Sequence, residues 1–168
     1  NTATLMPRPD TEVLVETALN VNDKADARVL DLGTGTGAIA LALASERPDW
    51  QIMAVDIVPE AVALAEKNRQ RLGLNNVSVM LSNWFEGVVP QKFDLIVTNP
   101  PYIDADDHHL KEGDIRFEPE SALVSGDEGL ADIHIIIGEA KRYLEKGGCL
   151  LIEHGYQQAN AVRQLLSD

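Results

Sequence analysis

A strand, a glycine-rich loop and a helix that follow one another directly constrain this chain most strongly. Residues 28–32 form a mainly apolar run that predicts a buried strand. The loop Gly33-Thr34-Gly35-Thr36-Gly37 comes next, and residues 38–46 are rich in strong helix formers. Glycines at such a turn permit a tight bend and let a ligand approach the backbone closely. The stretch therefore predicts a ligand-binding loop at the carboxyl end of a parallel strand.

The rest of the chain repeats this alternation of strand and helix. Further strands are predicted over 51–56, 77–81, 93–98 and 149–153, and helices over 11–19, 59–72, 130–144 and 157–166. The glycines at 147 and 148 are expected to stop the helix that precedes the last strand. The pattern predicts an α/β fold with a doubly wound, mainly parallel sheet and helices on both faces.

Length and charge narrow the class of protein. The 168 residues fit one domain with a real core. The net charge of −13 argues against direct nucleic-acid binding, which needs a basic surface, and favours a small cationic ligand or a basic protein partner. No apolar stretch is long enough for a membrane span, so no membrane partner is expected. The single cysteine, Cys149, fits a reducing cytoplasm, which is the expected location.

Asp56 ends the second predicted strand, about 20 residues after the glycines. An acidic side chain at that position accepts hydrogen bonds from ribose hydroxyls, so the pair predicts a cofactor that contains a nucleoside. The glycines do not identify that cofactor, because Gly33-x-Gly35-x-x-Ala38 also satisfies the NAD fingerprint. Trp84, which follows the third strand, is a candidate to cover an adenine ring, whereas Phe85 is expected to pack in the core.

Asn99-Pro100-Pro101-Tyr102 ends the strand predicted over 93–98, because neither proline can donate to a ladder. An amide and a phenol are thus left at the carboxyl end of a central strand, where open α/β sheets bind ligands. Asn99 offers a carbonyl acceptor, the backbone carbonyls beside the prolines offer others, and Tyr102 offers a flat face. Together they are suited to hold a planar –NH2 group by both hydrogens. A simple strand-terminating turn is the alternative interpretation.

The histidines do not predict a metal site. His108 and His109 lie in an acidic stretch between 103 and 127, and adjacent histidines do not share a helix face. His134 and His154 are expected to be structural. The stretch itself is interpreted from its length as a lid or substrate loop. Its excess of acidic residues suggests that it faces a basic partner, and a solvated lid is the alternative interpretation.

These motifs together carry a resemblance. The chain is similar to S-adenosylmethionine-dependent methyltransferases of the Rossmann-like class, and more narrowly it resembles the HemK/PrmC family, which modifies a glutamine side-chain amide in peptide-chain release factors. The matching stretches are Pro7-Arg8-Pro9-Asp10-Thr11-Glu12, Val29 to Gly37, Asn99-Pro100-Pro101-Tyr102-Ile103, and Arg116-Phe117-Glu118-Pro119 with Ala122-Leu123. They cover most of the chain, and the first and last are far more specific than the glycines.

The resemblance implies a role for each candidate residue. Gly33 to Gly37 (with Thr34, Gly35 and Thr36 between them) would cradle the methionine part of S-adenosyl-L-methionine, and Asp56 would bind its ribose. Trp84 would flank the adenine, with Asn99 also on the cofactor side. Asn99, Pro100, Pro101 and Tyr102 would hold the glutamine amide of the release factor's GGQ motif. The family usually has an acidic residue where this chain has Asn83, so weaker discrimination of adenine is expected.

The resemblance also implies a domain organisation. The family has an amino-terminal helical domain that binds the substrate and a sheet completed by two further strands. Residues 1–168 are therefore expected to be the catalytic domain, as a fragment truncated at both ends.

Three other functions stay open. A methyltransferase acting on an exocyclic amino group of a nucleic-acid base would use the same Asn-Pro-Pro-Tyr chemistry on a flipped base. A nucleotide-binding module without catalysis would keep the glycine loop alone. An NAD oxidoreductase has no evident hydride-acceptor site.

Overall fold

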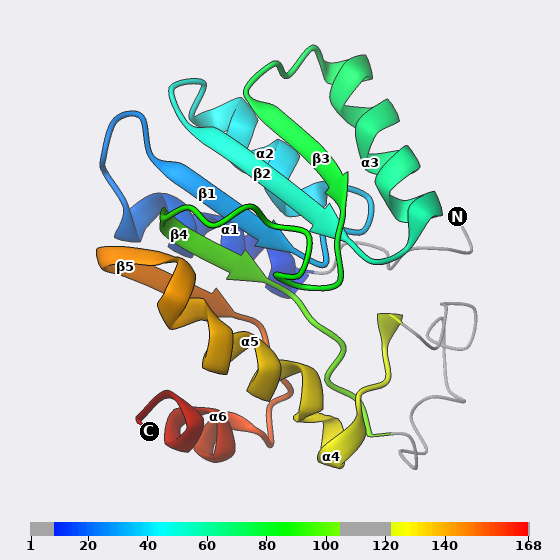
Figure 1. Cartoon of the computed structure of the whole chain (residues 1–168), viewed down its shortest axis with the longest axis vertical. Coiled ribbons are helices and arrows are strands. Elements are labelled where there is room, and N and C mark those ends of the chain that lie inside the picture. Colours follow the sequence, from blue (N-terminus) through cyan, green and yellow to red (C-terminus); the bar gives the residue numbers. More distant parts are fainter. Residues whose placement is uncertain (1–8, 105–121, 168) are drawn as a thin grey trace.

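Five parallel strands form one sheet in the order β3-β2-β1-β4-β5 (Figure 1). The computed structural model describes residues 9–104 and 122–167. The strands are β1 (Arg28–Leu32), β2 (Gln51–Asp56), β3 (Val77–Leu81), β4 (Phe93–Thr98) and β5 (Leu144–Ile152). The helices are α1 (Pro9–Val21), α2 (Ala38–Glu46), α3 (Pro59–Leu72), α4 (Gly126–Gly129), α5 (Ala131–Tyr143) and α6 (Ala159–Ser167). The predicted α/β class with a parallel sheet is confirmed.

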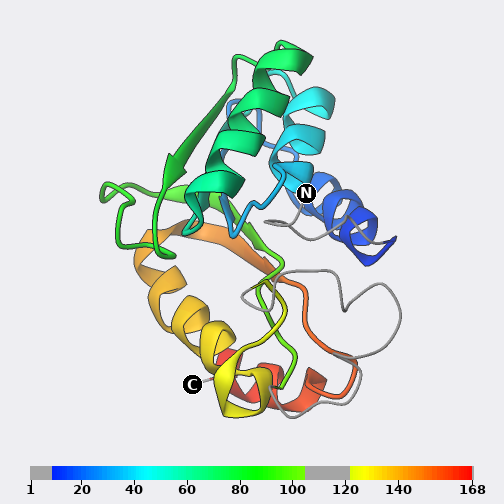
Figure 2. The same cartoon turned by 90° about the vertical axis from the view of Figure 1, so that its right-hand side faces the viewer.

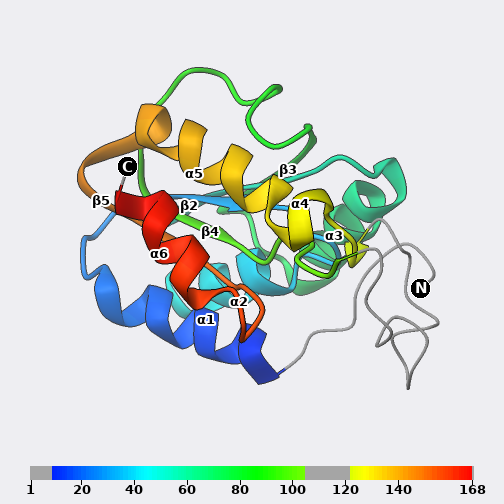
Figure 3. The same ribbon diagram turned by 90° about the horizontal axis from the view of Figure 1, so that it is seen from below.

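The sheet separates two apolar cores because alternate residues of each strand point to opposite faces. In β1, Val29 packs with α1 and α2 on one face, whereas Leu30 and Leu32 pack with α5 on the other. All three side chains are fully buried. Figure 3 shows α1 and α2 on one side of the strands and α5 on the other, and Figure 2 shows α2 and α3 together on the first side.

Most elements match the prediction. The strands β1 to β4 and the helices α2 and α3 have the predicted bounds. The first helix is longer than predicted and includes Pro9 in its first turn, where a missing N–H costs nothing. The last helix begins two residues later than predicted, at Ala159. Phe85 is buried as expected and stacks on Tyr143, with ring centroids 4.6 Å apart.

The prediction was wrong where α5 meets β5. The helix ends at Tyr143 and the strand begins at once at Leu144, so Gly147 and Gly148 lie inside β5 and stop no helix. The pairing of β4 with β5 changes register between Phe93 and Leu95. Gly147 has a φ of +84°, and a Cβ on Gly148 would lie 3.0 Å from the Phe93 carbonyl oxygen. The glycines therefore permit an irregularity in the strand.

Several predicted features lie outside the described residues. They are the start of the first family-like stretch (Pro7-Arg8), the histidines His108 and His109, the segment Arg116-Phe117-Glu118-Pro119, and the acidic residues between 105 and 121. Within residues 9–104 and 122–167, no helix is long and apolar enough to cross a membrane.

The strand order creates a crevice at one edge of the sheet. The chain runs outward from β1 through β2 to β3 and then returns to place β4 on the other side of β1. The connections that follow the neighbouring strands β1 and β4 therefore run in opposite directions. Their divergence leaves a crevice at the carboxyl ends of the two strands, and open α/β sheets bind ligands at such a switch point.

Candidate functional site

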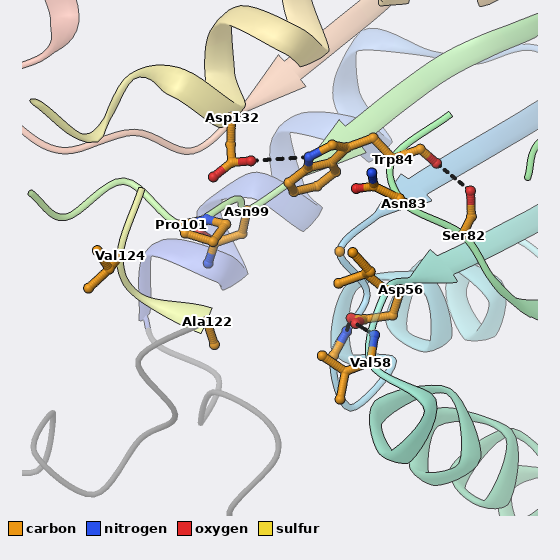
Figure 4. A pocket seen from close by; sticks show the side chains of 13 residues that line it. Asp56, Val58, Ser82, Asn83, Trp84, Asn99, Pro101, Ala122, Val124 and Asp132 are labelled. Atoms are coloured by element: carbon orange, nitrogen blue, oxygen red, sulfur yellow. Dashed lines mark hydrogen bonds between the residues drawn. The ribbon is translucent and has the colours of Figure 1, made fainter. Parts of the chain in front are cut away.

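A cavity of about 400 Å³ opens at the carboxyl ends of β1, β2 and β4 (Figure 4). Its volume is within the range of small-molecule sites. The loops after these strands contribute to its wall, with the loop after β3 and the segment that leads into α5. The lining residues are Gly33, Gly35, Asp56, Ile57, Val58, Ser82, Asn83, Trp84, Asn99, Pro101, Ala122, Val124 and Asp132.

Two glycines of the loop after β1 form part of this wall. Gly33 and Gly35 have φ values of +70° and +57°, a region that residues with a Cβ rarely adopt. A Cβ added to Gly35 would meet no heavy atom within 4 Å, so the backbone there faces open space. The loop for which the sequence predicts ligand binding thus presents bare backbone to the cavity at Gly35.

The other three loop residues lie outside the lining and shape the turn. The Thr34 N–H donates to the Val55 carbonyl at 2.9 Å. The Thr36 carbonyl accepts a hydrogen bond from Asn68 Nδ2 at 2.9 Å. Gly37 is the N-cap of α2 and has a φ of +85°, and a Cβ there would lie 2.9 Å from the Leu41 side chain.

Asp31 holds the loop from beneath. Its Oδ2 accepts hydrogen bonds from Thr34 Oγ1 at 2.6 Å and from the Ala40 N–H at 3.2 Å. Burial, with a smaller contribution from the charge of Asp56, raises the pKa of Asp31 to about 7 against the lowering effect of these two hydrogen bonds. Among the described residues, none hydrogen-bonds the buried Oδ1. Asp31 therefore supports the turn and does not line the cavity.

Asp56, at the end of β2, holds the glycine loop from the neighbouring strand. Its Oδ2 accepts a hydrogen bond from the Gly35 N–H at 2.8 Å, and its Oδ1 accepts one from the Val58 N–H at 2.9 Å. The residue is 8% exposed and still faces the cavity. Each carboxylate oxygen can accept more than one hydrogen bond, so both keep capacity for a ligand hydroxyl.

Trp84 lines the cavity beside Gly33. A Cβ added to Gly33 would lie 3.3 Å from the indole ring, so the ring rests on the loop backbone. The indole Nε1 donates to Asp132 Oδ1 at 3.1 Å (Figure 4). Asn83 also lines the cavity, and its Nδ2 donates to Glu86 Oε1 at 3.0 Å.

The residues of Asn-Pro-Pro-Tyr line different hollows. Asn99 and Pro101 line the main cavity, and no described residue hydrogen-bonds the Asn99 amide. Pro100 and Tyr102 lie beside a much smaller hollow with Asn99, Pro101 and Ile103, and Tyr102 also lines a separate cavity of about 360 Å³ beside α1 and the end of β5. The structure thus brings the Asn99 amide to the same cavity as the glycine loop and Asp56.

Tyr102 is anchored at both ends. Its hydroxyl lies 3.4 Å from Glu153 Oε1, and its carbonyl accepts a hydrogen bond from Gln158 Nε2 at 3.0 Å. A Cβ on Gly129 would clash with that carbonyl oxygen, so only glycine fits there. These contacts fix the direction in which the chain leaves the Asn-Pro-Pro-Tyr segment.

The charge of the lining has one sign. Asp56 and Asp132 contribute carboxylates, and the described lining contains no lysine, arginine or histidine. Such a wall suits a ligand that carries positive charge better than one with a pyrophosphate. Away from the cavity, His154 Nδ1 lies 2.9 Å from the Gly155 carbonyl oxygen. In the part of the chain that is described, no cluster of three or more potential metal ligands occurs.

The sequence interpretation missed Asp31 and Asp132. A signal existed for Asp31, because an acidic residue between Leu30 and Leu32 interrupts an apolar buried strand. No local signal existed for Asp132, because an aspartate in the first turn of a helix is ordinary and only the fold brings it to Trp84.

Comparison with known proteins identifies the family of this chain. Residues 23–168 match the family described as "Methyltransferase domain". The chain is 64% identical over 163 residues to a release factor glutamine methyltransferase of Pseudomonas aeruginosa, covering 97% of this chain and 59% of that protein. It is 58% identical over 166 residues to the release factor glutamine methyltransferase of Shewanella oneidensis, covering 99% and 58%. The chain thus spans less than two thirds of the length of these relatives.

A solved structure shows the same fold. A ribosomal protein L11 methylase from Lactobacillus delbrueckii subsp. bulgaricus superposes with a TM-score of 0.71 at 21% identity, covering 98% of this chain and 70% of that chain. The likeness at this identity concerns the arrangement of strands and helices.

Proposed function

The chain belongs to the methyltransferase domain family, and from that premise we propose that it transfers a methyl group from S-adenosyl-L-methionine to the side-chain amide nitrogen of a glutamine in peptide-chain release factors. The proposal assigns residues 1–168 to the catalytic domain. The observation that carries it is the position of Asn99, whose amide lines the same cavity as Gly35 and Asp56. A cofactor cradle and a binder of planar –NH2 groups thus share one space.

The residues of the cavity fit the cofactor. The bare backbone at Gly35 leaves room for its methionine part, and Asp56 can accept hydrogen bonds from ribose hydroxyls. Trp84 presents an aromatic face beside Asn83. The acidic lining suits a ligand with a sulfonium and an ammonium group and counts against NAD. When bound, the cofactor supplies an electrophilic methyl group.

The protein's part in the reaction is to hold the acceptor. An amide nitrogen is a poor nucleophile because its lone pair is delocalised. In the proposed arrangement, Asn99 Oδ1 accepts one hydrogen of the glutamine amide and the Pro100 carbonyl accepts the other. These oxygens stabilise the positive charge that develops on the nitrogen. Holding the nitrogen in line for attack contributes on the order of 7–11 kcal/mol.

Two further residues complete the acceptor site. Pro101 forms part of the wall beside Asn99. Tyr102 packs against the planar amide from the neighbouring hollow, and Gln158 holds its backbone. Among the described residues the lining contains no histidine or lysine to take up the proton, so the proton is proposed to leave to water after transfer. Residues Thr34, Thr36 and Gly37 act by keeping the loop in its turn.

The proposal includes the partner and its place in the cell. The net charge of −13 favours a basic protein surface over a nucleic-acid backbone. The single cysteine accords with a cytoplasmic location, where release factors act.

A transfer assay tests the function. The intact protein is incubated with S-adenosylmethionine that carries a labelled methyl group and with a release factor, its variant lacking the target glutamine, DNA or RNA. We expect label on the release factor and none on its variant without the glutamine, on DNA or on RNA. Label on a nucleic-acid base would contradict the proposal and support the base methyltransferase.

A further inference from the structure

One hydrogen bond in the cavity wall joins segments that are 48 residues apart. Trp84 Nε1, in the loop after β3, donates to Asp132 Oδ1, in the first turn of α5, at 3.1 Å. Figure 4 shows the indole and the carboxylate facing one another at one side of the pocket, with Asn99 and Pro101 close by. Both partners line the cavity. The contact therefore belongs to its wall and has no role assigned so far.

The Trp84 side of this contact is held in an unfavourable conformation. Its φ of +44° is uncommon for a residue with a bulky side chain. Ser82 Oγ donates to the Trp84 carbonyl at 2.8 Å and accepts the Gly87 N–H at 2.8 Å, which fixes the turn. The turn aims the indole at Gly33, where the ring rests on the loop. Strain of this kind persists only when neighbouring contacts hold the residue.

The Asp132 side continues toward the acceptor segment. The Asp132 N–H donates to Ser125 Oγ at 3.1 Å, and Ser125 is 3% exposed. The Ser125 N–H donates to the Ile103 carbonyl at 3.0 Å, and the Ile103 N–H donates to the Leu123 carbonyl at 2.9 Å. Ile103 directly follows Tyr102. Asp132 is thus connected by its side chain to the cofactor wall and by its backbone to the end of Asn-Pro-Pro-Tyr.

We propose that Asp132 is a positioning residue that holds Trp84 against the glycine loop and, through Ser125 and Ile103, keeps the acceptor segment at a set distance from the cofactor wall. This inference rests on the proposed function for the identity of the two ligands. In physical terms, Asp132 connects two walls of one cavity. Because the in-line attack needs both walls in register, the residue acts on cofactor affinity and on acceptor placement together.

Two other roles for Asp132 give different expectations. A residue that only begins α5 would change stability and leave both affinities alone. A carboxylate that acts by its charge would lose its effect in Asp132→Asn as fully as in Asp132→Ala. A positioning residue keeps most of its effect in Asp132→Asn, because the amide oxygen still accepts the indole N–H.

The tryptophans allow a direct test in the ligand-free protein. The chain has two, and Trp50 Nε1 donates to the Lys24 carbonyl at 3.0 Å, far from Asp132 in the fold. In a ¹H–¹⁵N spectrum, Asp132→Ala should shift the Trp84 indole signal upfield and speed its hydrogen exchange, with the Trp50 signal unchanged. Asp132→Asn should keep the signal near its original position. A Trp84 indole signal that does not move in Asp132→Ala would overturn the proposal.

A double-mutant cycle measures the coupling. Asp132→Ala and Trp84→Phe should each weaken S-adenosylmethionine binding about tenfold, the effect of losing one hydrogen bond to a charged group at a partly exposed site. The double variant should lose little more, since either change already breaks the contact. Additive losses would overturn the proposal. The matched control is Glu139→Ala, which removes an exposed carboxylate from the same helix and should leave affinity unchanged.

The acceptor side is tested with the intact protein. Asp132→Ala should raise KM for the release factor and lower kcat, and Asp132→Asn should recover most of both. Loss of active protein alone, with KM and cofactor affinity unchanged, would overturn the proposal in favour of a structural role. Failure of the proposed function is distinguishable, because a wild-type protein that methylates no release factor leaves the indole spectrum and the cofactor cycle fully readable.

Discussion

The Gly35 N–H donates to Asp56 Oδ2 at 2.8 Å, and this hydrogen bond connects the middle of the glycine loop to the end of the neighbouring strand β2. The carboxylate meets the loop backbone and the cavity at once. A ligand that reaches Asp56 therefore meets a loop whose shape that same side chain maintains. Cofactor binding and loop geometry depend on one residue.

We expect Asp56→Ala to weaken S-adenosylmethionine binding by about 1.5–3 kcal/mol, because hydrogen bonds to a charged group are lost. The variant also frees the Gly35 and Val58 N–H groups, which adds to the loss. Titration calorimetry measures the affinity. Asp49→Ala, an aspartate in an exposed turn before β2, is the matched control and should bind like the wild type. Equal affinity in both variants would mean that the ribose binds elsewhere.

Gly35→Ala and Gly73→Ala form a matched pair. Both glycines have a positive φ, +57° and +68°, and an added Cβ meets no heavy atom within 4 Å at either site. Each substitution should cost about 1–2 kcal/mol of stability from the left-handed backbone alone. Only Gly35→Ala should also lose cofactor affinity, by about tenfold or more, because its methyl group projects where a ligand approaches the backbone.

Thermal unfolding and calorimetry on the two glycine variants separate these effects, since Gly73 ends α3 away from the cavity. If Gly35→Ala kept wild-type affinity, the cradle would not contact the cofactor.

Asp31 should make stability depend on pH. Burial raises the pKa of Asp31 from its ordinary value of 3.8 to about 7 in the folded protein. Between these pH values the folded state binds more protons than the unfolded state, so the contribution of Asp31 is fully present below pH 3.8 and is lost as pH rises to about 7. The loss is on the order of a few kcal/mol.

Chemical denaturation from pH 4 to pH 8 tests this expectation. Asp31→Asn should show a flatter fall of the free energy of unfolding with rising pH than the wild type. Glu139→Gln, which removes an exposed carboxylate, controls for net charge. An unchanged slope in Asp31→Asn would show that the carboxyl does not titrate in this window.

Asn99→Ala should lower turnover about 10²–10³-fold, as expected when one preorganised transition-state contact is lost. Cofactor affinity should be nearly unchanged, because the glycine loop and Asp56 stay intact. Asn99→Asp still accepts a hydrogen from the amide but adds a negative charge near the sulfonium, so its turnover should fall between those of Asn99→Ala and wild type. Single-turnover transfer to a release factor measures both. Wild-type turnover in Asn99→Ala would contradict the mechanism.

The positions of Gly33, Gly35 and Asp56 could be predicted because each is determined by the end of a strand whose apolar pattern is local. Asn99 could be predicted for the same reason. Asp132 could not, because its partner is 48 residues away and the pairing depends on how α5 packs. The early start of β5 could not be predicted either. A glycine after a helical stretch usually ends the helix, whereas Gly147 lies inside an irregular strand.

The order of the strands also bears on how the domain folds and how it is stabilised. Thr98 Oγ1 donates to the Leu32 carbonyl at 2.8 Å, which joins β4 to β1 across 66 residues of chain. Closing so large a loop costs entropy, and such distant pairings are typical of slow folding steps. The cavity spans this seam, with Gly35 on one side and Asn99 on the other. A ligand that contacts both sides binds only when β1 and β4 are paired. At a free concentration of 100 times its Kd, it therefore adds about 2.7 kcal/mol to the free energy of unfolding of the sheet. The cofactor is therefore expected to act as a non-covalent cross-link between the two halves of the domain.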